Sequence, residues 1–161
     1  MQHKWAIHTP SLGDFAELTD VWEASVRATH DFLPGSYIQL LRPLVKDQYL
    51  DCVMLACCKD PARNKISGFV GVAAGKVEML FIHPDYRGLG IGKSLLTFAI
   101  NEFNAQELDV NEQNAQAVGF YFKQGFEVVG RCEKDGLGQP YPLLHLRYKR
   151  LPRAFIKCSR A

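Results

Sequence analysis

The chain opens with a short mixed strand at 4–8, and its apolar residues then recur at helical spacing. Ser11 or Asp14 is suited to cap a first helix that runs to about Thr29. A break at Pro34-Gly35 follows, and a second apolar stripe predicts a helix over 36–46. The first third of the chain is therefore expected to form one strand and two helices.

The apolar pattern then changes to that of strands. Three consecutive runs, at 53–59, 66–74 and 76–83, are separated by turn residues and predict three antiparallel strands. Helical periodicity returns over 91–103, and a short strand follows at 107–111. A strand, a helix and a strand in this order predict a parallel pair joined by a right-handed crossover.

The last part of the pattern is a helix over 114–124 and two strands. Gly125 is suited to the position after the helix, where a left-handed backbone is common. The final strands, at 126–133 and 141–148, flank an Asp135-Gly136 turn. The complete order predicts an α/β protein with a mixed sheet.

The junction between the strand at 76–83 and the helix at 91–103 carries the most informative chemistry. Its turn contains Gly88, Gly90 and Gly92, so free backbone N–H groups and the positive end of the helix dipole can converge on a phosphate. A dinucleotide fingerprint needs a different glycine spacing, and a P-loop needs glycine where Arg87 stands. The turn therefore predicts an anion site for another nucleotide-like ligand.

Two motifs give the chain a family resemblance. Arg87 to Gly92 fits the pattern Gln/Arg-x-x-Gly-x-Gly/Ala, and 111–126 supplies a second segment, with Asn114 and Tyr121 seven residues apart. With both motifs in this order, the chain resembles the GNAT acetyltransferases over about 77–126. The resemblance implies a mixed sheet of about seven strands with about four helices, in which two parallel central strands splay apart and form the cofactor cleft.

The resemblance also implies the cofactor, acetyl-CoA (coenzyme A), and the residues that hold it. Main-chain groups of Leu80, Phe81 and Ile82 would pair with pantetheine. The residues that would hold the pyrophosphate are Arg87, Gly88, Leu89, Gly90, Ile91, Gly92, Lys93 and Ser94. Asn114 would hydrogen-bond the cofactor, although an Asn that opens a helix also serves as an N-cap.

Tyr121 is the predicted general acid, because a phenol stays protonated near neutrality and can protonate the departing thiolate. Plain aromatic packing is its alternative role. Glu78 interrupts an apolar strand and is the predicted base, on the expectation that burial raises its pKa. A salt bridge at the strand edge is the alternative for Glu78, and Asp109 is a second candidate base.

No family motif identifies the residues that would bind the acceptor amine. His30 and Tyr141 are candidates for the acceptor pocket, and Cys132 is a candidate for a covalent relay, which direct transfer in a ternary complex makes unnecessary. The resemblance thus predicts an N-acetyltransferase acting on a primary amine of a small molecule or a protein. A non-catalytic acyl-CoA sensor or interaction module is the alternative.

The composition of the chain limits the number of domains and the kinds of partner that are expected. The 161 residues, 47% of them hydrophobic, suit one domain over 1–150 with a tail at 151–161. A net charge of +2 does not argue for nucleic acid, and no apolar run is long enough to span a bilayer. Five cysteines without zinc-like spacing indicate no metal site and suggest reduced, mostly buried thiols in a cytoplasmic protein. A monomer and a homodimer both remain open.

Overall fold

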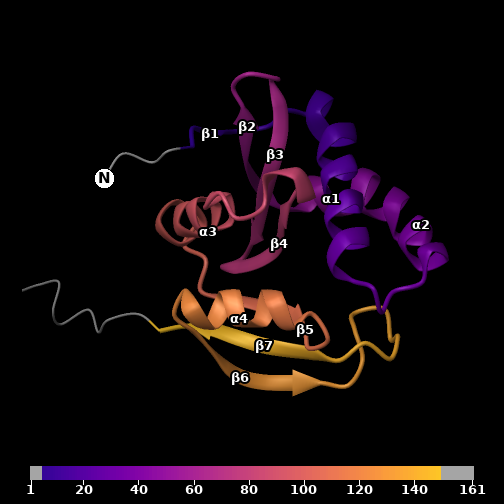
Figure 1. The fold of residues 1–161 in the computed structure, drawn as a ribbon. Coiled ribbons are helices and arrows are strands. Elements are labelled where there is room, and N and C mark those ends of the chain that lie inside the picture. Colours follow the sequence, from indigo (N-terminus) through magenta and orange to yellow (C-terminus); the bar gives the residue numbers. More distant parts are fainter. Residues whose placement is uncertain (1–4, 150–161) are drawn as a thin grey trace, which may run out of the picture. The chain divides into compact units, whose positions relative to one another are not determined.

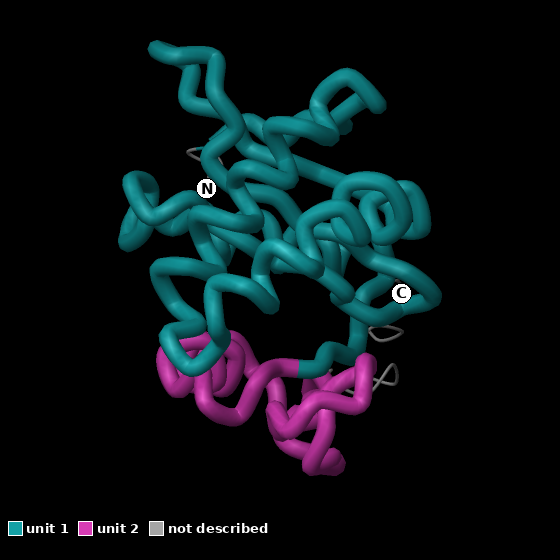
Figure 2. The backbone as a smooth tube through the Cα atoms, turned by 90° about the vertical axis from the view of Figure 1, so that its right-hand side faces the viewer, with its two compact units in different colours: residues 1–109 teal, residues 110–161 magenta. Residues whose placement is uncertain are grey.

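A computed structural model of the chain describes residues 5–149. It divides into two compact units, residues 1–109 and 110–161, which are coloured teal and magenta in Figure 2. The seven strands have the order β1-β2-β3-β4-β5-β7-β6 (Figure 1), and the helices and strands follow one another along the chain in the predicted order. The predicted α/β fold class with a mixed sheet is confirmed.

The first helical layer consists of α1 (Phe15–Thr29), which follows the short 3-10 turn η1 (Leu12–Asp14), and α2 (Gly35–Leu44). The carboxylate of Asp14 accepts the N–H of Ser11 at 2.9 Å. Leu18, Val21 and Trp22 on α1 are buried, as the apolar stripe predicted.

The second helix continues further than its pattern predicted. After Leu44 the chain forms the π-helical segment η2 (Val45–Tyr49) and the 3-10 turn η3 (Leu50–Cys52). Pro43 lies inside α2 and has no N–H to give to the regular ladder. The wider π turn keeps both Val45 and Leu50 buried, because it changes the rotation between them.

The sheet of the first unit is antiparallel through its first four strands: β1 (Ile7–His8), β2 (Met54–Asp60), β3 (Lys65–Ala73) and β4 (Lys76–Ile82). Figure 1 shows α1 and α2 on one side of these strands and α3 (Ile91–Glu102) on the other.

The two faces of this sheet have separate cores. Cys57 lies opposite Phe69 and belongs to the cluster under α1 and α2. Its neighbour Cys58 lies opposite Gly68, and a Cβ at Gly68 would stand 3.2 Å from Ile91 of α3. Each neighbouring cysteine therefore faces a different layer.

The parallel pairing is short. β5 (Glu107–Asn111) runs parallel to β4, as predicted, but only Lys76 with Glu107 and Val77 with Leu108 are paired. Among the described residues, β3 is the only strand paired with the rest of β4, which continues to Ile82. This short pairing is what a splayed pair of central strands requires.

The second unit contains α4 (Ala115–Lys123), β6 (Phe126–Cys132) and β7 (Leu143–Tyr148), and its two strands are antiparallel. Gly125 has φ +98°, so its predicted place after the helix is confirmed. The last strand begins at Leu143 rather than at residue 141, because Pro142 and Pro140 cannot donate ladder hydrogen bonds.

The structure leaves some expectations open or corrects them. The first strand is only two residues long, and the tail predicted at 151–161 lies outside the described residues. No helix within 5–149 has the length and apolar character needed to cross a membrane. The single domain over 1–150 stays a prediction.

Candidate active site

The predicted anion turn links β4 to α3 within the first unit. Gly90 is the N-cap of α3, and its carbonyl accepts the N–H of Ser94 at 3.0 Å. Gly88 and Gly90 have φ values of +74° and +82°, which favour glycine, and a Cβ built on either would meet no atom within 4 Å. The turn therefore combines a helix N-terminus with an unobstructed backbone, which is the arrangement that an anion requires.

A short turn before the glycines is fixed by side chains. The 3-10 turn η4 (Pro84–Tyr86) is closed at its start by His83, whose Nδ1 accepts the N–H of Asp85 at 3.2 Å. The hydroxyl of Tyr86 donates to Asp60 at 2.7 Å, and this hydrogen bond lowers the pKa of Asp60. No periodic pattern indicated the contact between Tyr86 and Asp60, because these residues lie 26 positions apart on different elements.

One edge of β4 is available for a strand-like ligand. Leu80, Phe81 and Ile82 pair with β3 on one side, and no β5 residue is paired with them on the other. An extended ligand can add to such an edge through main-chain hydrogen bonds. The edge fits the pantetheine contact that the family resemblance implied for these three residues.

Glu78 occupies a β-bulge. Gly71 of β3 pairs with Met79 and the next residue, Val72, pairs with Val77, so Glu78 is the extra residue of β4. Its side chain is exposed. The expectation that Glu78 is buried is therefore wrong, because the bulge takes this residue out of the regular alternation of the strand.

Asp109, the second candidate base, is already in an ion pair. Lys76 donates to its carboxylate at 2.6 Å. Burial acts against the charge on Lys76, but the hydrogen bond and charge of Asp109 outweigh it, so the pKa of Lys76 is raised. The ion pair joins β4 to β5, and the role of Asp109 as a second candidate base stays a prediction.

Asn114 and Tyr121 lie two turns apart on α4 in the second unit. The side-chain oxygen of Asn114 accepts the N–H of Ala117 at 3.3 Å, so the N-cap role is confirmed. Because the oxygen is used in the cap, the amide N–H₂ is the group with which Asn114 can bind a ligand.

Tyr121 packs among aromatic rings. Its ring centroid lies 5.3 Å from that of Phe120 and 5.8 Å from that of Phe126. Burial raises the pKa of the Tyr121 phenol. Within residues 5–149 its oxygen has no hydrogen-bond partner, yet no fully buried side-chain oxygen or nitrogen there lacks one. The raised pKa keeps the phenol protonated, so its hydroxyl is a hydrogen-bond donor at neutral pH.

His30 ends α1, and its Nδ1 lies 2.8 Å from the hydroxyl of Thr29. Burial lowers the pKa of His30 despite the opposing charge of Asp31, so the imidazole is neutral at neutral pH. This arrangement matches a structural hydrogen bond at a helix end. The pocket roles of His30 and Tyr141 stay predictions.

The cysteines divide into two kinds. Cys57 and Cys58 are buried, and burial raises the pKa of each to about 11. Cys52 and Cys132 are exposed, so the expectation of mostly buried thiols holds for only half of the described ones. The sulfur of Cys132 lies 3.1 Å from Nε2 of His145, a contact that the sequence did not suggest.

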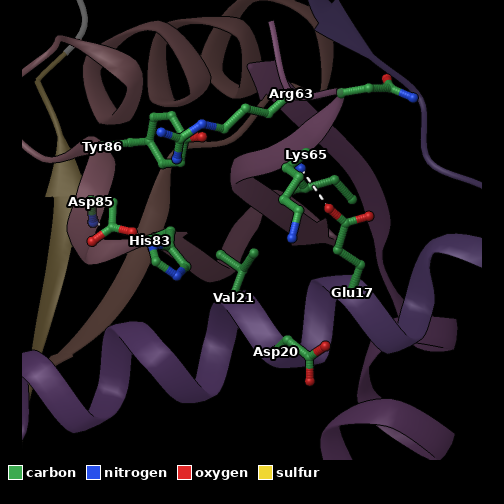
Figure 3. Close-up of a pocket in the computed structure, with 10 residues that line it drawn as sticks. Glu17, Asp20, Val21, Arg63, Lys65, His83, Asp85 and Tyr86 are labelled. Atoms are coloured by element: carbon green, nitrogen blue, oxygen red, sulfur yellow. Dashed lines mark hydrogen bonds and ion pairs between the residues drawn. The ribbon is translucent and has the colours of Figure 1, made fainter. Parts of the chain in front are cut away.

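A recess of about 670 Å³ lies in the first unit, between α1, the β2–β3 turn and η4 (Figure 3). Its lining includes Glu17, Asp20, Arg63 and His83, but none of the predicted site residues. Glu17 accepts the N–H of Ile66 at 2.7 Å, which is the dashed line in Figure 3.

Asp20 is likewise bound to Arg42, at 2.6 Å. Both carboxylates that α1 contributes to this recess are therefore already paired within the protein. The hydrogen bond between Ile66 and Glu17 joins α1 to β3 at the wall of this recess.

A mixed sheet with a glycine-rich turn at a strand-to-helix junction is typical of proteins that bind nucleotide-type cofactors. The profile of the acetyltransferase (GNAT) domain matches residues 56–139. The chain belongs to the GNAT acetyltransferase family. The family and the acyltransferase activity predicted from the sequence are thereby confirmed.

Individual relatives agree with this membership. The chain is 45% identical to the peptidyl-lysine N-acetyltransferase YjaB of Salmonella typhimurium (strain LT2) over 132 residues, which are 82% of this chain and 90% of that protein. The solution structure of apo-form YjaB from Escherichia coli matches with a TM-score of 0.81 and 40% identity, over 92% of this chain and all of that one (100%).

A more distant neighbour shares the fold alone. The PaiA N-acetyltransferase from Thermoplasma acidophilum, solved in complex with coenzyme A, matches with a TM-score of 0.69 and 23% identity, covering 91% of this chain and 100% of that one.

Proposed function

We propose that this enzyme transfers the acetyl group of acetyl-CoA to the ε-amino group of lysine residues in peptides or proteins. The observation that carries the proposal is the 45% identity to a peptidyl-lysine N-acetyltransferase over 90% of that protein's length. The sequence alone had left the acceptor amine open. The cytoplasmic location, the single domain and the choice between monomer and homodimer stay predictions.

The cofactor half of the proposed site lies in the first unit. N–H groups at the start of α3, from Gly90 to Lys93, would hold the pyrophosphate together with the side chain of Arg87. The edge of β4 from Leu80 to Ile82 would bind the pantetheine arm. Open space beside Gly88 and Gly90 is consistent with a ligand at close range.

The proposed reaction is direct attack of a neutral amine on the thioester carbonyl. A new C–N bond forms, negative charge develops on the carbonyl oxygen, and a β4 N–H near Phe81 or Ile82 would stabilise that charge. The C–S bond then breaks, and Tyr121 would donate its proton to the departing thiolate. The raised pKa suits Tyr121 to this role, because the phenol is still protonated when the C–S bond breaks.

Glu78 is the proposed acceptor of the amine proton. Its exposed position in the bulge lets it pass the proton on to water. Replacing Glu78 by Gln should lower kcat/KM most at low pH, where the amine is most completely protonated. An unchanged pH–rate profile would assign the base elsewhere.

The test of the function is acetylation of a lysine-containing peptide with a blocked N-terminus, followed by mass spectrometry. A matched peptide with lysine replaced by norleucine is the control, because it lacks the amine. Acetyl transfer to lysine alone is the expected result. Tight coenzyme A binding without transfer to peptides or small amines would instead support the alternative, a non-catalytic acyl-CoA sensor.

A further inference from the structure

Trp5 makes a long-range contact with the glycine turn. Its indole Nε1 donates a hydrogen bond to the carbonyl oxygen of Leu89 at 3.0 Å, across 84 residues of sequence. Trp5 lies just before β1, whereas Leu89 lies between Tyr86 and the start of α3. This hydrogen bond therefore joins the N-terminal segment to the turn that is proposed to bind the pyrophosphate.

The turn needs such an external support, because Leu89 stands between two glycines. Gly88 and Gly90 both have positive φ values, and glycine can move between left-handed and right-handed conformations at little steric cost. The peptide planes beside Leu89 can consequently rotate with small resistance from the backbone itself. A fixed hydrogen-bond donor to the Leu89 carbonyl selects one orientation.

Orientation matters because a peptide unit is rigid. The Leu89–Gly90 peptide is trans, so its C=O and its N–H point in opposite directions. With the carbonyl held by Trp5, the N–H of Gly90 is directed away from the indole. Gly90 is the N-cap of α3, so this N–H joins the free N–H groups of the first helical turn.

We propose that Trp5 is a positioning residue for the cofactor: its indole N–H holds the Leu89 carbonyl so that the N–H of Gly90 faces the pyrophosphate. The proposal rests on the proposed function, because it assumes that this turn binds coenzyme A. Trp5 acts through the turn and has no part in acetyl transfer itself. Removing the donor should therefore weaken the binding of ligands that contain pyrophosphate.

The first experiment compares the wild type with Trp5→Phe, which keeps an aromatic ring but removes the donor. Isothermal titration with coenzyme A should give a dissociation constant about three- to tenfold higher in the variant, the effect of one lost hydrogen bond. The kcat/KM with S-acetylpantetheine, which has no pyrophosphate, should be unchanged. A merely structural role would weaken coenzyme A binding and lower the kcat/KM for S-acetylpantetheine together.

A second measurement needs no mutation of the contact. The chain has two tryptophans, Trp5 and Trp22, so the wild-type protein should give two indole N–H signals in a nitrogen-15 spectrum. Trp22 lies on the buried face of α1 and serves as an internal control. Addition of coenzyme A should shift the Trp5 signal and leave the Trp22 signal in place.

The outcomes distinguish the proposal from the function on which it rests. A wild-type protein that fails to bind coenzyme A would refute the proposed function. Three results would refute the positioning role while the enzyme remains an acetyltransferase. They are normal coenzyme A binding by Trp5→Phe, an equal loss of coenzyme A binding and of kcat/KM with S-acetylpantetheine, and an unmoved Trp5 signal.

Discussion

Replacement of Tyr121 by Phe should separate catalysis from stability. The side chain is 8% exposed and packs against Phe120 and Phe126, contacts that a phenylalanine ring can also make. The lost hydroxyl has no partner within residues 5–149. Because no hydrogen bond to a residue in the described range is broken, the free energy of unfolding should change by no more than about 0.5 kcal/mol.

The catalytic effect should be much larger. If Tyr121 protonates the thiolate, its loss should lower kcat by about 100-fold or more, the contribution expected of a general acid, with little change in the dissociation constant of coenzyme A. Burial raises the pKa of Tyr121, so in the wild type this acid should cause no loss of kcat up to about pH 10, the ordinary tyrosine value.

The assay is steady-state acetylation of a lysine peptide at saturating acetyl-CoA, beside urea unfolding of the same preparations. Tyr148→Phe is the matched control, because the Tyr148 ring lies in the same cluster, 5.3 Å from Phe126. The control should keep its kcat. Full turnover by Tyr121→Phe would refute the assignment, and so would equal losses of kcat in the two variants.

Three further predictions concern the thiols and the glycines. Burial raises the pKa of Cys57 and Cys58 from 9.0 to about 11, so their stabilising contribution is complete below pH 9 and is lost as the pH rises to about 11. Urea unfolding across this range should show a decline that is smaller when both are replaced by Ala, because the raised pKa values of Tyr121 and Lys76 account for the remainder. Gly90→Ala should lower the free energy of unfolding by about 1 kcal/mol, because φ is +82° there. Gly119→Ala, inside α4 with open space around it, should raise that free energy by about 0.5–1 kcal/mol, and equal shifts in the two variants would contradict the backbone argument. Cys132→Ser should keep kcat within about twofold, because direct transfer needs no thiol, whereas an acetylated Cys132 seen by mass spectrometry would indicate a relay.

Local pattern was sufficient for the order of the elements. Periodicity, the glycine turn and the helix end at Gly125 each depend on residues close together in the sequence, and the structure contains each of them. The end of the second helix was misjudged because Pro43 and the burial of Leu50 together favour a π turn. Such a turn depends on packing against α1 and has no periodic signature of its own.

Only part of the candidate site could be predicted from local sequence patterns. Its glycines and the capping role of Asn114 are local features. The exposure of Glu78 depends on the register between β3 and β4, and a single inserted residue changes the face to which a strand side chain points. The contact of Trp5 with the turn depends on the folded position of the N-terminal segment, 84 residues away in sequence.

The adjacent thiols of β2 can report on the dynamics of the first unit without any introduced label. Cys57 faces the layer under α1 and α2, and Cys58 faces the layer of α3. A thiol reagent can reach each sulfur only when its own layer opens, and the rates of labelling under native conditions give the opening free energies. The two sides of one sheet can thus be compared for local unfolding at neighbouring atoms of the same strand.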